Sequence, residues 1–313
     1  MSLAPAAPAP RDERADERRG LWLAALAAVL FSAKAIVAKL LYRHGIDAYT
    51  LIALRMAMAV PVFAWIAWRE SRRAQVPLSR RDWMLLGWLA FLGYYLSSFL
   101  DFWGLMYVAA SLERLILFLT PTLVLVISAL VLGKSIPAGQ WWAMGVSYAG
   151  IVLVFIENLR LGGSHVAFGS TLIFGAALSY AVYLIISGEI VRRVGATRLV
   201  AYVMCGSTLM CLLQYLLVHP PAALLQQVAP VYGWSLVNAV LCTVLPVFLT
   251  MAAIERIGAA RTSQLSVLGP VSLVFLGAWI LDESITLLQL LGTAVVLLGI
   301  GILTRPRPLA VDQ

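Results

Sequence analysis

The stretch ASLERLILFLTPTLVLVISALVLGKSIPAGQWWAMGVSYAG (110–150) decides the fold of this chain, because the sequence contains a second version of it. A shift of 149 residues places it without a gap on AARTSQLSVLGPVSLVFLGAWILDESITLLQLLGTAVVLLG (259–299). The identities between the two versions include Ala110/Ala259, Leu119/Leu268, Pro121/Pro270, Ala129/Ala278, Leu132/Leu281, Ser135/Ser284, Ile136/Ile285, Gln140/Gln289 and Gly150/Gly299. The paired prolines and the ungapped match indicate an internal duplication.

The composition predicts a membrane protein. Of the 313 residues, 62% are hydrophobic and 12% are charged, and the mean hydropathy is +0.90. Soluble domains carry about a quarter charged residues, so about half of the usual charge is missing. The net charge of +8 could indicate nucleic-acid binding in a soluble protein. In a membrane protein it is better explained by basic cytoplasmic loops, so we expect a lipid bilayer and no nucleic acid as the partner.

Apolar runs bounded by charged or turn residues predict ten membrane-spanning segments. They cover residues 20–42, 48–68, 83–104, 110–132, 137–156, 168–190, 197–218, 231–254, 259–281 and 286–304. Runs of this length predict helices, because only helices and closed barrels satisfy the backbone polar groups in lipid. We expect the first run to be retained as a span, since a signal-peptide cut after Ala33 would place Phe31 at a position that requires a small residue.

The basic residues of the connections predict the orientation. With the N-terminus inside, seventeen Lys and Arg residues fall on the cytoplasmic side and three, Arg43, Arg114 and Arg160, on the other. Both termini are therefore expected in the cytoplasm. We expect cytoplasmic tails at 1–19, without ordered structure, and at 305–313. Repeats at 20–156 and 168–304 would have five spans each, and an odd number of spans inverts the second repeat relative to the first.

Three stretches resemble the EamA modules of the drug/metabolite transporter superfamily. They are DAYTLIALRMAMA (47–59), LILFLTPTLVLVISALVLGKS (115–135) and LSVLGPVSLVFLGAWILDES (265–284). The resemblance covers about residues 20–304. It implies ten helices in two inverted five-helix repeats, and a transporter that exports amino acids or other metabolites. Lys134 departs from the family, because many relatives carry Glu at the end of this span, as Glu283 does in the second copy.

Two cations inside spans are candidate substrate ligands. Lys34 lies in the first span and Arg55 in the second, both in the outer half of the membrane, and charges at such depth are often functional. They could receive a carboxylate or phosphate of the substrate. Alternatively, they could form structural ion pairs with Asp101 or Glu113. For Arg55 we favour this structural role, and for Lys34 the structural and the substrate-binding roles are equally open. No carboxylate falls at mid-membrane, so facilitated transport remains as open as proton coupling.

Aromatic and hydroxyl side chains near the middle of spans 3 and 6 predict the lining of a cavity. Tyrosines usually gather at the membrane interfaces, so several at mid-depth are unusual. The alternative is ordinary helix packing with the hydroxyl groups bonded to neighbouring backbone. The candidate substrate-binding residues of this kind are Tyr94, Tyr95, Ser98, Trp103, Tyr180 and Tyr183.

Three prolines, Pro121, Pro246 and Pro270, fall inside spans 4, 8 and 9. Each removes a backbone hydrogen bond and is expected to kink its helix. They are candidate gating hinges, and static bends are the alternative. Small residues in spans 5 and 10 predict close packing, either within one chain or in a homodimer, so a monomer and a homodimer both stay open. These residues are Ala143, Ser147, Gly150, Gly292, Gly299 and Gly301.

The motifs predict no enzyme, no metal site and no cofactor. No GxxxxGK[ST], HExxH or GxSxG motif is present in the sequence. The leading hypothesis is a secondary transporter of the bacterial inner membrane that exports small organic metabolites, favouring amino acids, including aromatic or other apolar ones, by alternating access. A carrier of nucleotide sugars, phosphorylated compounds or drugs is the alternative within the same fold. An intramembrane lipid-modifying enzyme is the alternative from another class.

Overall fold

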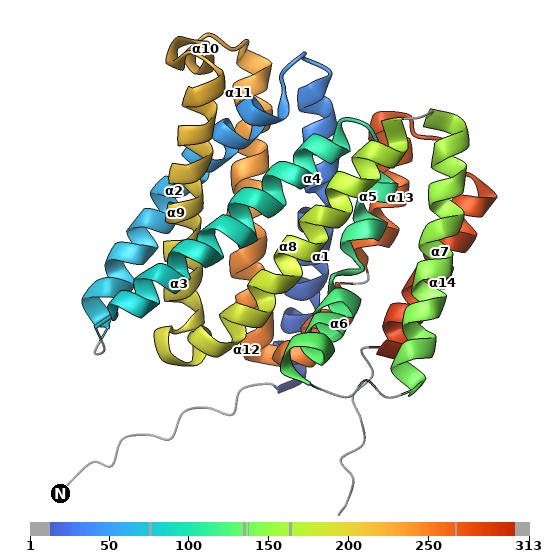
Figure 1. Ribbon diagram of the computed structural model, residues 1–313, viewed down its shortest axis with the longest axis horizontal. Helices are drawn as coiled ribbons and strands as arrows, with labels where there is room; N and C mark the ends of the chain where they lie inside the picture. Colours follow the sequence, from blue (N-terminus) through green and yellow to red (C-terminus); the bar gives the residue numbers. More distant parts are fainter. Residues whose placement is uncertain are drawn as a thin grey trace, which may run out of the picture.

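The chain forms a bundle of helices, shown as a ribbon in Figure 1. The computed structural model describes residues 13–74, 77–133, 136, 138–162, 165–266 and 268–303. The helices of the first half are α1 (Glu13–Tyr42), α2 (Ala48–Arg73), α3 (Arg80–Ala90), η1 (Phe91–Leu96), α4 (Ser97–Leu105), α5 (Ala110–Leu117), α6 (Thr120–Leu132) and α7 (Ala138–Gly162). Those of the second half are α8 (His165–Val194), α9 (Ala196–Val218), α10 (Pro221–Leu225), α11 (Ala229–Ala239), η2 (Val240–Val244), α12 (Leu245–Leu265), α13 (Leu268–Leu281) and α14 (Leu287–Leu303). The described residues contain no β-strand.

The prediction of an all-helical membrane protein is confirmed. Eight helical stretches within the described residues are long and apolar enough to cross a membrane, and two shorter apolar helices, Leu268–Leu281 and Leu287–Ile302, follow them. The predicted boundary between spans 8 and 9 coincides with a break at Gly258, whose φ of 81° suits glycine.

The predicted tail 1–19 requires a correction, because α1 begins at Glu13. Its first turns are held by an ion pair between Asp16 and Arg256, with N···O at 3.2 Å, and by a second between Glu17 and Arg261. Residues 1–12, Lys134, Ser135 and the tail from residue 304 lie outside the described part of the chain.

The contacts between helices are related by the sequence repeat. A contact made by a helix of one repeat has a counterpart made by the corresponding helix of the other repeat. The first span, α1, packs on α12 and α13, and its counterpart α8 packs on α4 and α6. The remaining pairs, α2 with α9 and α7 with α14, lie at opposite edges of the bundle in Figure 1. We call α1, α12 and α13 the α1 group, and α4, α5, α6 and α8 the α8 group.

Helix irregularities also occur at matching positions of the two repeats. The π-helical segment η1 begins at Phe91 and η2 begins at Val240, which is the same 149-residue shift. In span 4 the helix breaks between α5 and α6, and in span 9 it breaks between α12 and α13. π-Helical turns inside α-helices are often found at functional sites. The repeated regions therefore share backbone irregularities as well as sequence.

The three candidate hinge prolines all lie at these irregularities. Pro121 and Pro270 stand in the first turns of α6 and α13, and Pro246 stands in the first turn of α12, which follows η2. Because Pro121 has no N–H, Leu117 O loses its helical donor, and Thr120 Oγ1 replaces it at 2.6 Å. The predicted interruption of the helix is present at these sites. Whether it acts as a hinge stays a prediction.

Hydroxyl groups from neighbouring helices bond the backbone around η1. Ser207 Oγ donates to Ala90 O and Ser179 Oγ donates to Leu92 O, both at 2.7 Å. In η2, Thr243 Oγ1 donates to Asn238 O at 2.9 Å. Lipid offers no replacement donors, so such hydroxyl groups are what allow irregular backbone at membrane depth. These bonds fix η1 against α8 and α9.

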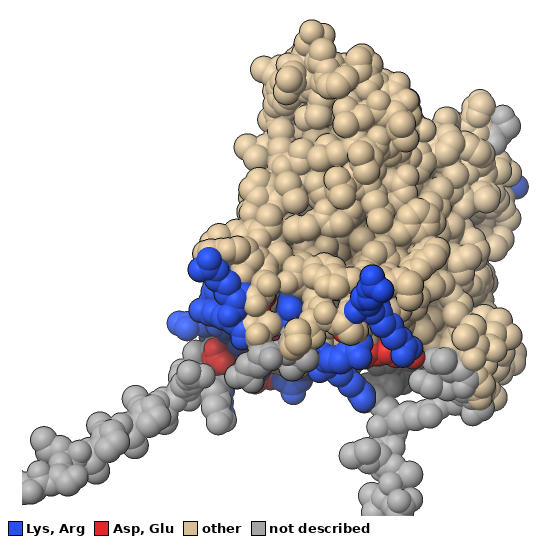
Figure 2. Space-filling view, turned by 60° about the vertical axis from the view of Figure 1, so that its left-hand side comes forward, with Lys and Arg blue, Asp and Glu red and all other residues tan. Residues whose placement is uncertain are grey.

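Positive charge gathers at one end of the bundle. Figure 2 shows Lys and Arg side chains at the end from which the N-terminal segment leaves, with few charges elsewhere on this face. The exposed cations on the helix ends that meet there are Arg14, Arg18, Arg19, Arg69, Arg72, Arg73, Arg80, Arg81, Arg192, Arg193, Arg256 and Arg261. This end is the one that the loop charges predict to be cytoplasmic.

Glycines bring α7 and α14 into close contact within one chain. A Cβ added to Gly150 would lie 2.7 Å from Gly292 O, and one added to Gly299 would lie 2.2 Å from Ser147 Oγ. Around Gly301, in contrast, nothing described lies within 4 Å. Of the two alternatives for the small residues, the structure shows packing inside the protomer, to which Gly301 does not contribute.

We expect Gly299→Ala to lower the thermal unfolding midpoint of the detergent-solubilised protein, because the added methyl group overlaps α7. Overpacking of this kind costs about 1–3 kcal/mol of unfolding free energy. The matched control, Gly301→Ala on the same helix, should leave the midpoint unchanged because its methyl group enters open space. Equal midpoints for the two variants would contradict this account of the α7–α14 contact.

Candidate functional site

An ion pair joins the two helix groups in the outer half of the bundle. Lys34 of α1 places Nζ 2.5 Å from Asp101 Oδ2 of α4 and 3.7 Å from Glu113 Oε1 of α5. The Asp101 side chain is 4% exposed, the Glu113 side chain 0% and the Lys34 side chain 16%. The structure therefore brings Lys34 to both carboxylates that the sequence offered as its structural partners.

Arg55 lies nearby on α2, without an acidic partner among the described residues. Its Nε donates to Thr243 Oγ1 of η2 at 2.9 Å, while Nη1 is buried and has no hydrogen-bond partner within the described part of the chain. Its Cζ lies 5.2 Å from the centroid of the Phe102 ring, and Lys34 Nζ lies 5.1 Å from the same centroid. The face of an aromatic ring attracts cations, so Phe102 stabilises both charges.

Tyr94, Tyr180 and Tyr183 form one aromatic cluster between η1 and α8. The centroids of Tyr180 and Tyr183 lie 5.3 Å apart in a stacked arrangement, and Tyr94 meets both rings edge-on. A Cβ on Gly93 would lie 2.4 Å from Tyr183 Cδ2, so glycine is required for this approach. Tyr94 lies near Arg55 and Tyr180 near Arg114, which places the cluster between two cations.

The other predicted lining residues have different surroundings. The ring partner of Tyr95 is Phe91, at 5.5 Å between centroids. Trp103 packs against Phe99 and Phe168, at 5.4 and 5.8 Å between centroids. Ser98 is half-buried on α4. None of these ring contacts joins the tyrosine cluster, so Tyr95, Ser98 and Trp103 have weaker structural support as substrate ligands than Tyr94, Tyr180 and Tyr183.

Arg114 is a cation that the sequence interpretation placed wrongly. It was counted among the charges of an external connection, although it lies inside the segment 110–132 that was itself predicted as a span. In the structure it belongs to α5, and its Nη2 lies 3.2 Å from where a Cβ on Gly269 would be. The side chain therefore extends from the α8 group toward the α1 group.

Contacts between the two helix groups occur at the outer ends of their helices. Tyr42 donates its hydroxyl to Phe102 O at 2.6 Å, and Glu283 Oε1 accepts the backbone N–H of Ala110 at 2.9 Å. The second contact also caps the N-terminus of α5, where a carboxylate is favoured. At the opposite end, the ion pairs join α1 to α12 and α3 to α8, which are neighbours within each half of this arrangement. The contacts between the α1 group and the α8 group therefore lie on the predicted outer side.

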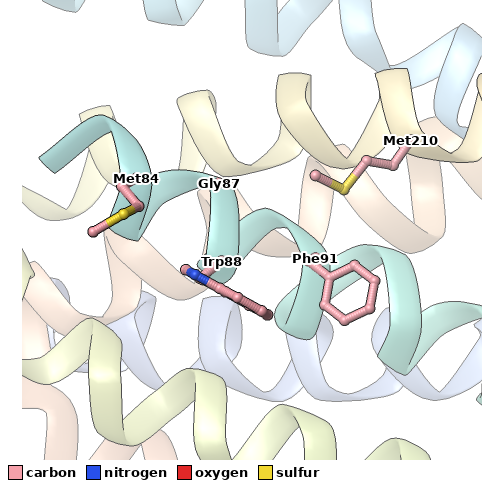
Figure 3. A pocket seen from close by; sticks show the side chains of 5 residues that line it. All are labelled: Met84, Gly87, Trp88, Phe91 and Met210. Carbon is pink, nitrogen blue, oxygen red and sulfur yellow. The ribbon is translucent and has the colours of Figure 1, made fainter. Parts of the chain in front are cut away.

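A groove of 390 Å³ lies on the bundle surface between α3, η1 and α9 (Figure 3). Apolar side chains and one glycine line it, from Met84, Gly87, Trp88, Phe91 and Met210. It contains no predicted site residue.

Among the described residues, eight helices that are long and apolar enough to cross a membrane indicate a multi-pass membrane protein. The model of the EamA-like transporter family matches residues 18–156 and again residues 167–305. The chain therefore belongs to the EamA-like transporter family, and it has the two-repeat architecture of that family. This confirms the family that the sequence motifs indicated.

Two relatives come from Bacillus subtilis (strain 168). "Uncharacterized transporter YcbK" is 30% identical over 276 residues, covering 84% of this chain and 86% of that protein. "Uncharacterized transporter YetK" is 23% identical over 294 residues, covering 91% and 86%. A solved crystal structure aligns with a TM-score of 0.63 at 16% identity over 90% of this chain and 95% of the other, which shows a shared fold. The family match and the two relatives point to a membrane transporter rather than an enzyme.

We expect Lys34→Met to destabilise the protein, because Asp101 would lose its buried counter-charge. Removing one partner of a buried ion pair costs about 3–5 kcal/mol of unfolding free energy. The double variant Lys34→Met/Asp101→Asn should recover most of that loss, and Arg18→Met, at an exposed position of the same helix, should change little. The thermal unfolding midpoints of the purified proteins provide the measurement. No recovery in the double variant would show that the ion pair is not the source of the effect.

Proposed function

We propose that this protein is a secondary transporter that exports a small organic metabolite, an amino acid in the first instance, by alternating access. It would work in the bacterial inner membrane, with ten helices in two inverted repeats and both termini in the cytoplasm. The substrate site is the region of Lys34, Arg55 and the tyrosine cluster. Family membership supports the transport activity. The bacterial relatives support the bacterial membrane, and the following observations support the repeat arrangement and the substrate class.

The inverted-repeat arrangement is supported by three observations. The helix pairs of the two repeats exchange with one another, and their π-helical segments begin at matching positions. The exposed cations gather at one end of the bundle, as they should if the second repeat is inverted and the positive-inside rule holds. In such transporters the substrate site lies near the midplane between the repeats. Arg55 and Thr243, which come from different repeats, already meet at such a contact.

The buried guanidinium group of Arg55 is the main support for the proposed substrate class. It is 5% exposed, and its Nη1 lacks a hydrogen-bond partner among the described residues. A buried charge without a counter-ion is costly, so a site of this kind is suited to an anionic group of a ligand. The tyrosine cluster nearby suits an apolar or aromatic side chain. A carboxylate joined to an apolar side chain describes an amino acid, which would reach Arg55 when the helix groups separate.

Nucleotide sugars and phosphorylated compounds are the second candidate class. Their phosphate groups carry more negative charge than a carboxylate and are generally held by several cations. Lys34 could contribute, but Asp101 already neutralises it at 2.5 Å. This ion pair favours the carboxylate over the phosphate.

The transport experiment uses the full chain in proteoliposomes. We expect radiolabelled amino acids to accumulate by counterflow against the same unlabelled amino acid, while labelled nucleotide sugars do not. Arg55→Gln should reduce this flux at least about tenfold, since a hydrogen bond to a charged group contributes about 1.5–3 kcal/mol. Arg73→Gln, at the exposed end of the same helix, should transport normally. Flux of a nucleotide sugar without any amino-acid flux would refute the substrate class.

The paired helix breaks generate a separate expectation about gating. If α6 and α13 move about the breaks before them, the double variant Pro121→Ala/Pro270→Ala should slow counterflow while leaving substrate affinity unchanged, because restored helical hydrogen bonds stiffen both joints. Pro61→Ala is the control, since this proline lies inside α2 away from the paired breaks. If the double variant transports at the normal rate, Pro121 and Pro270 do not act as hinges.

A further inference from the structure

Glu113 is an unusual residue for the interior of a membrane bundle. Its side chain is 0% exposed, and neither carboxylate oxygen has a hydrogen-bond partner within the described residues. The nearest cation is Lys34, whose Nζ lies 3.7 Å from Oε1, too far for a hydrogen bond. An ionised carboxylate in this position would be buried without any donor. Such groups require a partner or a proton.

Lys34 cannot satisfy both carboxylates. Its ammonium group lies 2.5 Å from Asp101 Oδ2, and this contact takes the close approach that Glu113 lacks. When two carboxylates share one site and one cation, the ionisation of one of them is opposed by the charge of the other. The site therefore has one ammonium group, one carboxylate paired with it and a second carboxyl group that is more stable with a proton.

A proton on Glu113 would also resolve a second unsatisfied atom. Asp101 Oδ1 is buried and has no hydrogen-bond partner within the described part of the chain. Glu113 and Asp101 belong to the same site, because Lys34 Nζ lies 2.5 Å from Asp101 Oδ2 and 3.7 Å from Glu113 Oε1. A protonated Glu113 can donate to Asp101 Oδ1, whereas two ionised carboxylates have no donor to offer. One proton thus supplies the missing bond between α4 and α5.

Several other charged and titratable groups lie around Glu113. On α1, Lys39 interacts electrostatically with Glu283 and Glu113, and the Tyr42 hydroxyl donates to Phe102 O. Beyond α13, Glu283 Oε1 accepts the backbone N–H of Ala110 at the start of α5. Arg114 is adjacent in sequence, but neighbouring positions of a helix do not face each other, and its guanidinium extends toward Gly269.

The remaining helices in contact with α5 contribute no closer charge among the described residues. From α8, Tyr180 lies near Arg114, and from α7, Tyr148 packs with the apolar cluster beside α5. From α2, Arg55 interacts with Asp101 over a longer range and bonds to Thr243. Lys34 is therefore the cation nearest to the two carboxylates among the described residues.

We propose that Asp101 and Glu113 form a proton-binding pair that couples transport to the proton gradient. The pair holds one proton, carried by Glu113, while α1 is closed against α4 and α5. It exchanges this proton with water when these helices separate. The coupling rests on the transport function proposed above, whereas the proton-binding pair does not. The proton comes from the aqueous phase and returns to it, and no other group is consumed.

The location of the pair explains how proton exchange would follow the conformational change. Lys34 comes from the α1 group, and both carboxylates come from the α8 group. Separation of the groups breaks the contact between Lys34 and Asp101 and the contact between Tyr42 and Phe102 that cover Glu113. Water then reaches the pair from the outer side, and closure removes it again. Opening and proton exchange are in this way the same event.

The first test needs no substrate. In infrared spectra of the purified full chain in lipid, titrated with pH, we expect the C=O stretch of a protonated, buried carboxyl group to persist at neutral pH. The band should be absent in Glu113→Gln. It should also be lost at neutral pH in Asp101→Asn, where Lys34 becomes free to pair with Glu113. Glu255→Gln, which removes an exposed carboxylate of α12, should retain it. A wild-type protein without the band, or a Glu113→Gln variant that keeps it, overturns the proposal.

The second test separates coupling from transport. In proteoliposomes, with a radiolabelled amino acid as the probe, an imposed pH gradient should drive accumulation by the wild type and by Glu255→Gln. Glu113→Gln should keep counterflow, while its gradient-driven accumulation falls to the level reached without a gradient. If the wild type shows counterflow but ignores the pH gradient, the coupling is refuted and the proposed function stands. If no amino acid moves at all, the proposed function is refuted, and the infrared titration still decides the proton pair.

Discussion

The ion pair between Lys34 and Asp101 is the contact on which the arrangement of this bundle depends. It joins α1 to α4, and so joins the two helix groups that the repeats produce. In lipid, each charge alone would carry a large desolvation cost. The ion pair therefore stabilises the conformation in which α1 and α4 are in contact. The hydrogen bonds of Tyr42 to Phe102 O and of Ala110 N–H to Glu283 also join the two groups, and neither is an ion pair. A transporter must nevertheless open, so the energy that holds the outer end closed must be recovered elsewhere in the cycle.

The backbone supplies the places where such movement can occur. A regular transmembrane helix is stiff because each carbonyl is bonded within the helix. In spans 3, 4, 8 and 9 this regularity is broken, at η1, before α6, at η2 and before α13. The freed carbonyl of Leu117 and the carbonyls of Ala90 and Leu92 accept side-chain hydroxyl groups. A hydroxyl can follow a carbonyl through a small rotation, so these joints can bend without leaving a polar atom exposed to lipid.

Much of the fold could be predicted from the sequence, because its main constraint is local. Hydropathy and charged boundaries located the spans, and the third span, predicted at 83–104, extends from Arg80 to Leu105 in the structure. The π-helical segments could not be predicted in the same way. The residues of η1 and η2 are ordinary for apolar helices, and for η1 the stabilising hydroxyl groups come from Ser179 and Ser207, which lie far away in the sequence.

The residues of the candidate site could be predicted from the sequence, but their contact partners could not. Lys34, Arg55 and the tyrosines could be recognised because charged and hydroxyl groups are rare at membrane depth. Their partners depend on which helices meet, and the positions of Asp101 and Glu113 at span ends made them look like interfacial charges. Arg114 looks like a connection residue in the sequence because it lies near the start of its span. In the structure, that start is buried beneath Glu283.

The difference between the repeats is where the chemistry of this protein arises. Under the 149-residue shift, Asp101 corresponds to Thr250 and Glu113 to Thr262, so the acidic pair exists in the first repeat alone. Tyr94 of η1 corresponds to Thr243 of η2. Tyr94 contacts the tyrosines of α8, whereas Thr243 accepts a hydrogen bond from Arg55. Two similar backbones thus present a carboxylate pair and aromatic rings from one side, and hydroxyl groups from the other. A binding site built between such halves is asymmetric, and it can therefore hold an asymmetric substrate in one orientation.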